Sequence, residues 1–138
     1  MNTTGVYEPE TADAVKTAYE NVGSVAQIVI KETTRAMGFD SVEYDERVTG
    51  DVIETARDAV FASLLTTYHG SREEFETWCE GRSFDVIERH GSENVDRVVW
   101  HPVVCRDTVV SASYQHEREA AAATVRRRAF GRYYRELL

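Results

Sequence analysis

The sequence predicts an α+β domain over residues 1–138, in which four N-terminal helices form a layer on a small three-stranded antiparallel sheet and a long helix ends the chain. Three observations lead to this prediction. Apolar residues recur at helical spacing as far as residue 80, three short β-branched segments follow, and an alanine run opens the last segment. No linker rich in proline or glycine divides the 138 residues, which favours one domain.

Single glycines and capping residues mark where the predicted helices begin and end. The helices are expected over residues 11–22, 24–37, 49–68 and 71–80, with a short helical turn around 41–48. Ser71 and Glu74 have the spacing of a capping box, in which each side chain binds a backbone N–H of the other residue. His69 and Gly70 are interpreted as the end of the third long helix, because glycine commonly terminates helices.

Three segments after residue 80 have the composition of strands. Residues 83–89, 95–101 and 107–115 are short and rich in β-branched and aromatic residues. Turn-forming residues separate them, so we expect a three-stranded antiparallel meander. Pro102 cannot donate a ladder hydrogen bond, so the middle strand is expected to end there or to lie at an edge.

The chain ends in TVRRRAFGRYYRELL, whose five arginines and three aromatics raise the question of nucleic-acid binding. Wound as a helix, the apolar positions fall together on one side: Val125, Ala129, Phe130, Tyr133, Tyr134 and Leu137. Four arginines fall on the other side: Arg127, Arg128, Arg132 and Arg135. The aromatics are therefore expected in the core rather than stacked on bases. We expect these arginines to pair with acidic residues of this domain or of a second copy.

Three long charged side chains fall on helix faces that otherwise carry apolar residues. Glu32 lies beside Val25 and Ile28 in the second helix, Arg57 interrupts the third, and Arg126 interrupts the last. Three interpretations stay open: the side chains reach water from the rim, form an internal ion-pair cluster, or line a pocket for a small anionic ligand. The sharpest expectation is that Arg57 or Arg126 is buried and bound to a carboxylate, with Glu32 the leading candidate.

Acidic residues outnumber basic ones by 24 to 16, for a net charge of −8, and only two of the basic residues are lysines. This composition is typical of a cytoplasm at molar salt, where the Debye length falls to about 3 Å and repulsion between carboxylates is screened. An ordinary acidic protein with GC-rich codon usage is the alternative. The N-terminal MNTTGVYEPE lacks the features of a secretory signal and no apolar run could span a bilayer, so a cytoplasmic location is expected.

No catalytic or metal-binding motif is recognisable in the sequence. His101 and Cys105 are four residues apart, but extended strand separates such positions by about 13 Å, too far for shared chemistry unless the chain folds back. Cys79 and Cys105 are expected to be free thiols, because two cysteines cannot make a disulfide framework. We therefore expect neither cofactor nor metal, and the sequence leans against an enzyme.

Two segments and the overall composition resemble a small family of haloarchaeal proteins of unknown function. The segments are YDERVTGDVIETARDAVFASLL and VRRRAFGRYYRELL, and the resemblance extends over nearly the whole chain. It implies a salt-loving host and a cytoplasmic location, and it carries no activity, ligand or catalytic residue.

The expected function is a non-enzymatic interaction or structural module adapted to high salt, with a second copy or another protein as its partner. The alternative is a domain or enzyme that binds a small anionic ligand through Glu32, Arg57 and Arg126. A concave pocket containing both arginines would favour the ligand, and a flat exposed apolar patch would favour a protein partner. Neither nucleic acid nor a membrane is expected to bind.

Salt dependence tests the inference of salt adaptation. We expect the midpoint of thermal unfolding to rise steadily between about 0.05 M and about 2 M KCl, because salt screens carboxylate repulsion and strengthens apolar burial. Circular dichroism across a KCl series measures the midpoint. Equal stability at the two ends of this range would contradict salt adaptation.

Overall fold

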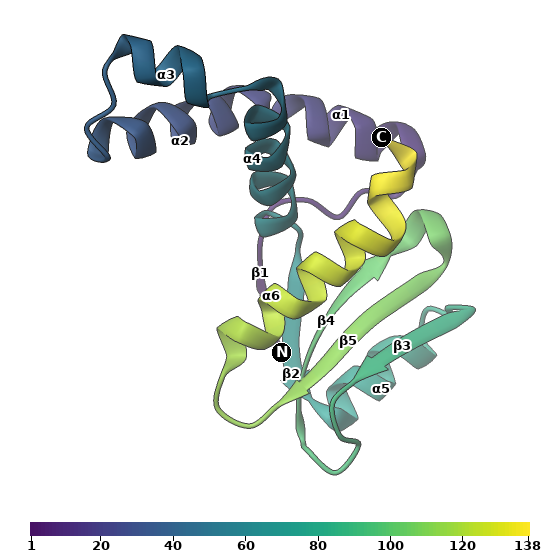
Figure 1. Cartoon of the computed structure of the whole chain (residues 1–138). Coiled ribbons are helices and arrows are strands. Elements are labelled where there is room, and N and C mark those ends of the chain that lie inside the picture. Colours follow the sequence, from purple (N-terminus) through teal and green to yellow (C-terminus); the bar gives the residue numbers. More distant parts are fainter.

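Five β-strands and six α-helices make up the computed structural model, which describes residues 1–138 (Figure 1). The strands are β1 (Asn2–Thr4), β2 (Thr67–Ser71), β3 (Val86–His90), β4 (Arg97–Val103) and β5 (Thr108–Tyr114). The helices are α1 (Ala12–Asn21), α2 (Gly23–Ala36), α3 (Ser41–Arg47), α4 (Gly50–Ser63), α5 (Arg72–Glu80) and α6 (Arg118–Ala129). The long C-terminal helix is confirmed, and it continues through a π-helical turn (Phe130–Tyr134) and a 3₁₀ turn (Arg135–Leu137). None of the helices has the length and apolar character needed to cross a membrane.

The strands form one mixed sheet in the order β1-β2-β4-β5-β3, so the predicted three-stranded antiparallel sheet is wrong. β4 and β5 do pair in antiparallel fashion, with Trp100 opposite Ser111. β3 lies on the far side of β5 and runs parallel to it, with Val86 opposite Thr108. β1 and β2, at the other edge, have no counterpart in the predicted sheet.

Burial explains why β5 rather than β3 occupies the inside of the sheet. The first five residues of β5 are all buried, whereas no residue of β3 is fully buried. β3 carries Glu88, Arg89 and His90, and charged side chains of this kind are tolerated at a sheet edge. The meander prediction pairs consecutive strands and takes no account of this difference, so it places β3 beside β4.

β2 begins where the sequence predicts the last turn of a long helix. α4 ends at Ser63, and the following Thr66 and Thr67 are β-branched residues that favour extended backbone. The pairing of β2 with β4 places His69 opposite Val99. His69 is therefore a buried strand residue and not the end of a helix.

Helices cover both faces of the sheet, where the sequence predicts a helical layer on one (Figure 1). α1, α4 and α6 contribute to a cluster of 16 buried residues that includes Val99 and Val110 of the sheet. α5 packs on the opposite face, where Phe75 and Trp78 contact Trp100. Successive residues of β4 point into different cores, so the strand is apolar along most of its length rather than alternating.

His101 of β4 joins three parts of the larger core. Its side chain is completely buried, with Nδ1 2.6 Å from the Thr66 carbonyl oxygen and Nε2 2.7 Å from the Tyr134 hydroxyl. A carbonyl oxygen can only accept a hydrogen bond, so Nδ1 carries the ring proton and the tyrosine donates to Nε2. The neutral ring thus links the start of β2, an inner strand and the C-terminal helical segment.

Residues 23–53, which we call the arm, extend away from the sheet (Figure 1). The arm contains α2, α3 and the first turn of α4, and none of its residues belongs to either core cluster. Only Ala26, Ile30 and Thr34 are buried in it. Val25 and Ile28, which helical spacing places on the apolar face of α2, are exposed.

The buried His101 makes stability depend on pH. Burial lowers the pKa of His101 from its ordinary value of 6.5 to about 4, although the hydrogen bond to Thr66 opposes the shift. The unfolded chain binds this proton near pH 6.5, whereas the folded protein does not. The contribution of His101 to the free energy of unfolding is therefore fully present above pH 6.5 and is lost as the pH falls toward 4. We expect His101→Gln to remove about 3 kcal/mol of the wild-type stability change over this range, measured by denaturant unfolding.

The matched control for this prediction is His116→Gln, because His116 is exposed. This variant should keep the wild-type pH dependence. The same pH dependence in all three proteins would contradict a buried, neutral His101.

Candidate functional site

Arg57 links α4 to the junction between α1 and α2 through hydrogen bonds. Its Nε donates to the Tyr19 carbonyl at 3.0 Å, one terminal nitrogen donates to the Glu20 carbonyl at 3.2 Å, and the guanidinium lies 4.6 Å from the centre of the Tyr19 ring. Gly23 leaves room for this contact, because a Cβ atom there would lie 2.9 Å from the guanidinium. The half-buried Arg57 therefore caps the C-terminal carbonyls of a helix rather than a carboxylate.

Arg126 plays a similar part at the junction between α4 and β2. Its Nε donates to the Leu65 carbonyl at 2.8 Å, and a terminal nitrogen lies 3.5 Å from the Thr4 hydroxyl. Burial lowers the pKa of Arg126, with the nearby Glu119 opposing the shift. This arginine, too, satisfies a backbone carbonyl.

The structure does not bring Glu32 together with the two arginines. Glu32 lies on the exposed surface of the arm, where it pairs with Arg35 at 3.3 Å. Arg57 and Arg126 contact different segments, and neither lines any of five surface pockets of the molecule. Each of the three side chains interrupts the apolar stripe of its helix, as the sequence indicates. They stay apart because α4 and α6 share the larger core, whereas α2, which carries Glu32, does not contribute to it.

Two of the C-terminal arginines pair with an acidic residue of the same chain. Glu88 of β3 is 3.1 Å from Nε of Arg128 and 3.6 Å from Nε of Arg132. Its other contacts are His90 and the Tyr133 hydroxyl. Burial alone would raise the pKa of Glu88, but the hydrogen bonds from His90, Arg128 and Tyr133 outweigh it and lower the pKa. This cluster fastens the edge strand to the C-terminal helix.

The two cysteines are free thiols. Cys79 is buried and Cys105 is half-buried. Burial raises the pKa of the Cys79 thiol to about 11, so it is not a thiolate near neutral pH. No three histidine, cysteine, aspartate or glutamate side chains are grouped to hold a metal ion.

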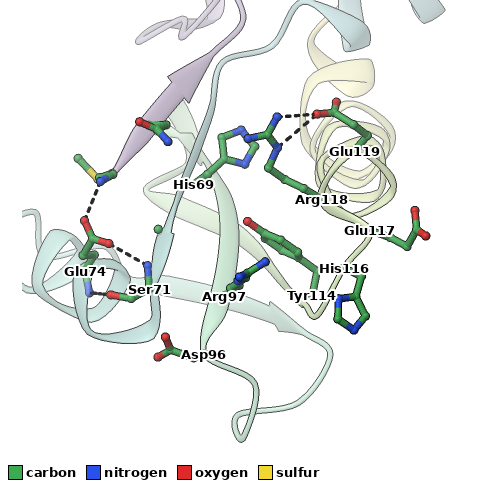
Figure 2. Close-up of a pocket in the computed structure, with 13 residues that line it drawn as sticks. His69, Ser71, Glu74, Asp96, Arg97, Tyr114, His116, Glu117, Arg118 and Glu119 are labelled. Carbon is green, nitrogen blue, oxygen red and sulfur yellow. Dashed lines mark hydrogen bonds and ion pairs between the residues drawn. The ribbon is translucent and has the colours of Figure 1, made fainter.

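A polar pocket of about 670 Å³ opens at one end of the sheet, beside the start of α6 (Figure 2). Arg97 on β4 stands opposite Ser71 of β2 and Tyr114 of β5, and all three line the pocket together with His69. Side chains alternate along strands, so these residues share the face that α6 covers further along the sheet. The first turn of α6, with Arg118, forms the wall.

Part of the charge in the pocket is already paired internally. Glu74 accepts from the Ser71 backbone N–H at 3.0 Å and pairs with the Met1 amino group at 2.8 Å. The capping box predicted from Ser71 and Glu74 is confirmed by these contacts around the start of α5. Arg118 binds Glu119 at 3.1 Å.

Three charged groups of the pocket have weak partners or none. Arg97 has a single contact, 3.5 Å from the Gln115 carbonyl. Asp96 and Glu117 are exposed and belong to none of the ion pairs of the molecule. A free guanidinium therefore shares one pocket with two free carboxylates.

His69 lies at the inner end of the pocket with one ring nitrogen unsatisfied. Its Nε2 is 3.2 Å from the hydroxyls of both Thr4 and Thr67, while its Nδ1 is buried and has no hydrogen-bond partner. Burial and then the charge of Arg118 lower the pKa of His69, so the ring is neutral near pH 7. Figure 2 shows the Arg118 side chain beside the His69 ring.

Sequence reasoning missed this pocket because segments far apart in the chain build it. The N-terminus with β1, β2 with the start of α5, β4, and the end of β5 with the start of α6 meet only through the sheet order, which the sequence did not reveal. The one local signal is the alternation Thr67, His69, Ser71, which places three polar side chains on the same face of a strand.

The fold defines the class of this protein: an α+β domain with a five-stranded mixed sheet covered on both faces. A family model described as a family of unknown function, DUF5809, matches residues 6–135, so the chain belongs to the DUF5809 family. Neither a curated protein nor a solved structure matches the chain. This match confirms the predicted resemblance to a family of unknown function.

Arg126 offers a test of the helix and strand junctions described here. Arg126→Met removes the hydrogen bond to the carbonyl of Leu65, a fully buried residue, and should cost about 1–3 kcal/mol in the free energy of unfolding. Arg127→Met, at the next position along the helix and exposed, should cost less than about 0.5 kcal/mol. Urea unfolding of both variants measures the difference, and equal costs would contradict the assigned role.

Proposed function

We propose that this chain is a non-enzymatic interaction module that associates with a second copy of itself through the arm. One observation carries the proposal: Val25, Ile28 and Val29 form an apolar stripe on α2 whose side chains are 43%, 60% and 44% exposed. Exposed apolar residues are normal when scattered, but here they are concentrated. Seven of the twelve large hydrophobic residues that are exposed belong to the arm: Val25, Ile28, Val29, Met37, Val42, Val52 and Ile53.

Charge supports a second copy as the occupant of this surface. Two chains that each carry a net charge of −8 repel one another wherever acidic surfaces meet. α2 carries two basic residues and one acidic residue, Lys31, Arg35 and Glu32, whereas α3, α4 and α5 each carry more acidic than basic residues. α2 is therefore an apolar helix face on which two copies can meet without like-charge repulsion.

A two-fold arrangement follows from the position of Ile28 in the stripe. In an antiparallel contact between two α2 helices centred on Ile28, this residue meets its own copy across the axis. Arg35 then lies opposite the partner's Asn21 and close to the partner's Glu20, so a cation faces the C-terminal end of the partner's α1. The same stripe thus supplies the apolar centre and a complementary rim.

We also infer a haloarchaeal host and a cytoplasm at molar salt. The excess of acidic residues and the presence of only two lysines support this inference. Salt would favour the proposed association, because it screens repulsion between the acidic domains and strengthens contact between apolar surfaces. Association should therefore be tightest in molar KCl.

Ile28→Glu tests the proposed interface. It places two carboxylates against each other at the axis, and like charges in contact across an interface oppose association. We expect sedimentation equilibrium in molar KCl to show a dimer for the wild type and a monomer for Ile28→Glu. Val6→Glu is the matched control, since Val6 is 65% exposed and lies outside the arm; it should remain dimeric.

A cysteine at the same position tests the geometry independently. Ile28→Cys should form a disulfide-linked dimer on mild oxidation, because the two side chains meet at the axis, whereas Val6→Cys should not. A wild type that is monomeric at all concentrations, or an Ile28→Glu variant that still dimerises, would overturn the proposal.

A further inference from the structure

The pocket beside the start of α6 has the chemistry of a binding site, separate from the arm. It is lined by strand side chains below and by a helical turn at the side, with about 670 Å³ of space between them (Figure 2). None of its lining residues belongs to residues 23–53. Whatever binds there can do so whether or not two arms associate.

One buried polar atom in the pocket lacks a partner. His69 is 5% exposed, and its Nδ1 makes no hydrogen bond, although buried polar groups are nearly always satisfied. The hydroxyls of Thr4 and Thr67 each lie 3.2 Å from Nε2 and 3.0 Å from one another, so they can donate to Nε2 or accept from it. An acceptor atom of a ligand at Nδ1 would favour the tautomer with the ring proton there and would satisfy this buried nitrogen.

Arg97, Arg118 and the first turn of α6 supply further hydrogen-bond donors to the same pocket. Arg97 has only a long contact with a backbone carbonyl, and Arg118 is bound only by the neighbouring Glu119. α6 begins at Glu117 without a side-chain cap, so the backbone N–H groups of its first turn are also free to donate. A carboxylate is the group that such a set of donors accommodates best.

The free acids oppose a simple anion and favour a ligand with two charges. Asp96 and Glu117 line the same pocket as Arg97 and have no cationic partner. An anion alone would be repelled by these two carboxylates, and a cation alone would be repelled by the guanidinium groups. Glu117 lies across the pocket from Asp96 (Figure 2), so a molecule with both charges a few bonds apart matches Arg97 and the neighbouring Asp96.

We propose that this pocket binds a small zwitterion of the α-amino-acid class. Its carboxylate is held by Arg97, Arg118 and Nδ1–H of His69. Its ammonium group is held by Asp96, the neighbour of Arg97 in the chain. The rest of the pocket leaves room for a side chain.

Isothermal titration calorimetry of the full chain in molar KCl tests the proposal. The probes are the twenty amino acids, with acetate and methylammonium as the two half-ligands. We expect at least one amino acid to bind and to protect the protein thermally, and both half-ligands to bind at least about tenfold more weakly. NMR of the side chains should show that the His69 ring shifts on titration and the buried His101 ring does not.

Two variants at exposed positions separate binding from folding. Arg97→Gln and Asp96→Asn should each weaken binding by about tenfold or more without lowering the unfolding midpoint of the free protein. Arg127→Gln, an exposed arginine outside the pocket, should bind as the wild type does. Failure of all twenty amino acids to bind, equal binding of acetate, or unchanged affinity in Arg97→Gln would overturn the proposal.

Discussion

The neutral ring of His101 is the contact on which the closed core depends. It lies inside the sheet, donates to Thr66 where α4 gives way to β2, and accepts from Tyr134 near the end of the chain. Protonation would place a second donor against the tyrosine and a charge in a fully buried site, and burial of an unpaired charge is costly. The folded protein therefore requires a His101 ring with a single proton, on Nδ1. In this form the ring connects β4 with the α4–β2 junction and with the C-terminal helical segment.

Two surfaces, the arm and the pocket beside α6, keep groups that have no partner within the chain. Arg57 and Arg126 satisfy carbonyls at helix and strand junctions, so these long cations serve the connections between elements. The arm lies outside both cores and keeps its apolar stripe in contact with solvent. The pocket beside α6 keeps an unpaired guanidinium and a buried, unsatisfied imidazole nitrogen. Our proposals of association through the arm and of ligand binding in the pocket rest on these two surfaces.

Local signals in the sequence predict much of this structure, and long-range pairing accounts for what they miss. The capping box of Ser71 and Glu74 and the apolar stripe of the C-terminal helix have short-range causes, and both are confirmed. The position of β3 depends on the greater burial of β5. Glu32 would meet Arg57 or Arg126 only if α2 shared the main core, and the apolar spacing within α2 does not show which core it faces. Gly70 predicts a helix end at His69, but the nearby β-branched Thr66 and Thr67 favour the strand that forms.

The central claim is that the arm is an association surface attached to an independent core. Amide hydrogen exchange, followed by mass spectrometry at protein concentrations above and below the association range in molar KCl, tests it most directly. The account predicts that protection of α2 rises with protein concentration while protection of β4 and β5 stays constant. Equal exchange of α2 at every concentration, or a concentration effect confined to the sheet, would contradict it.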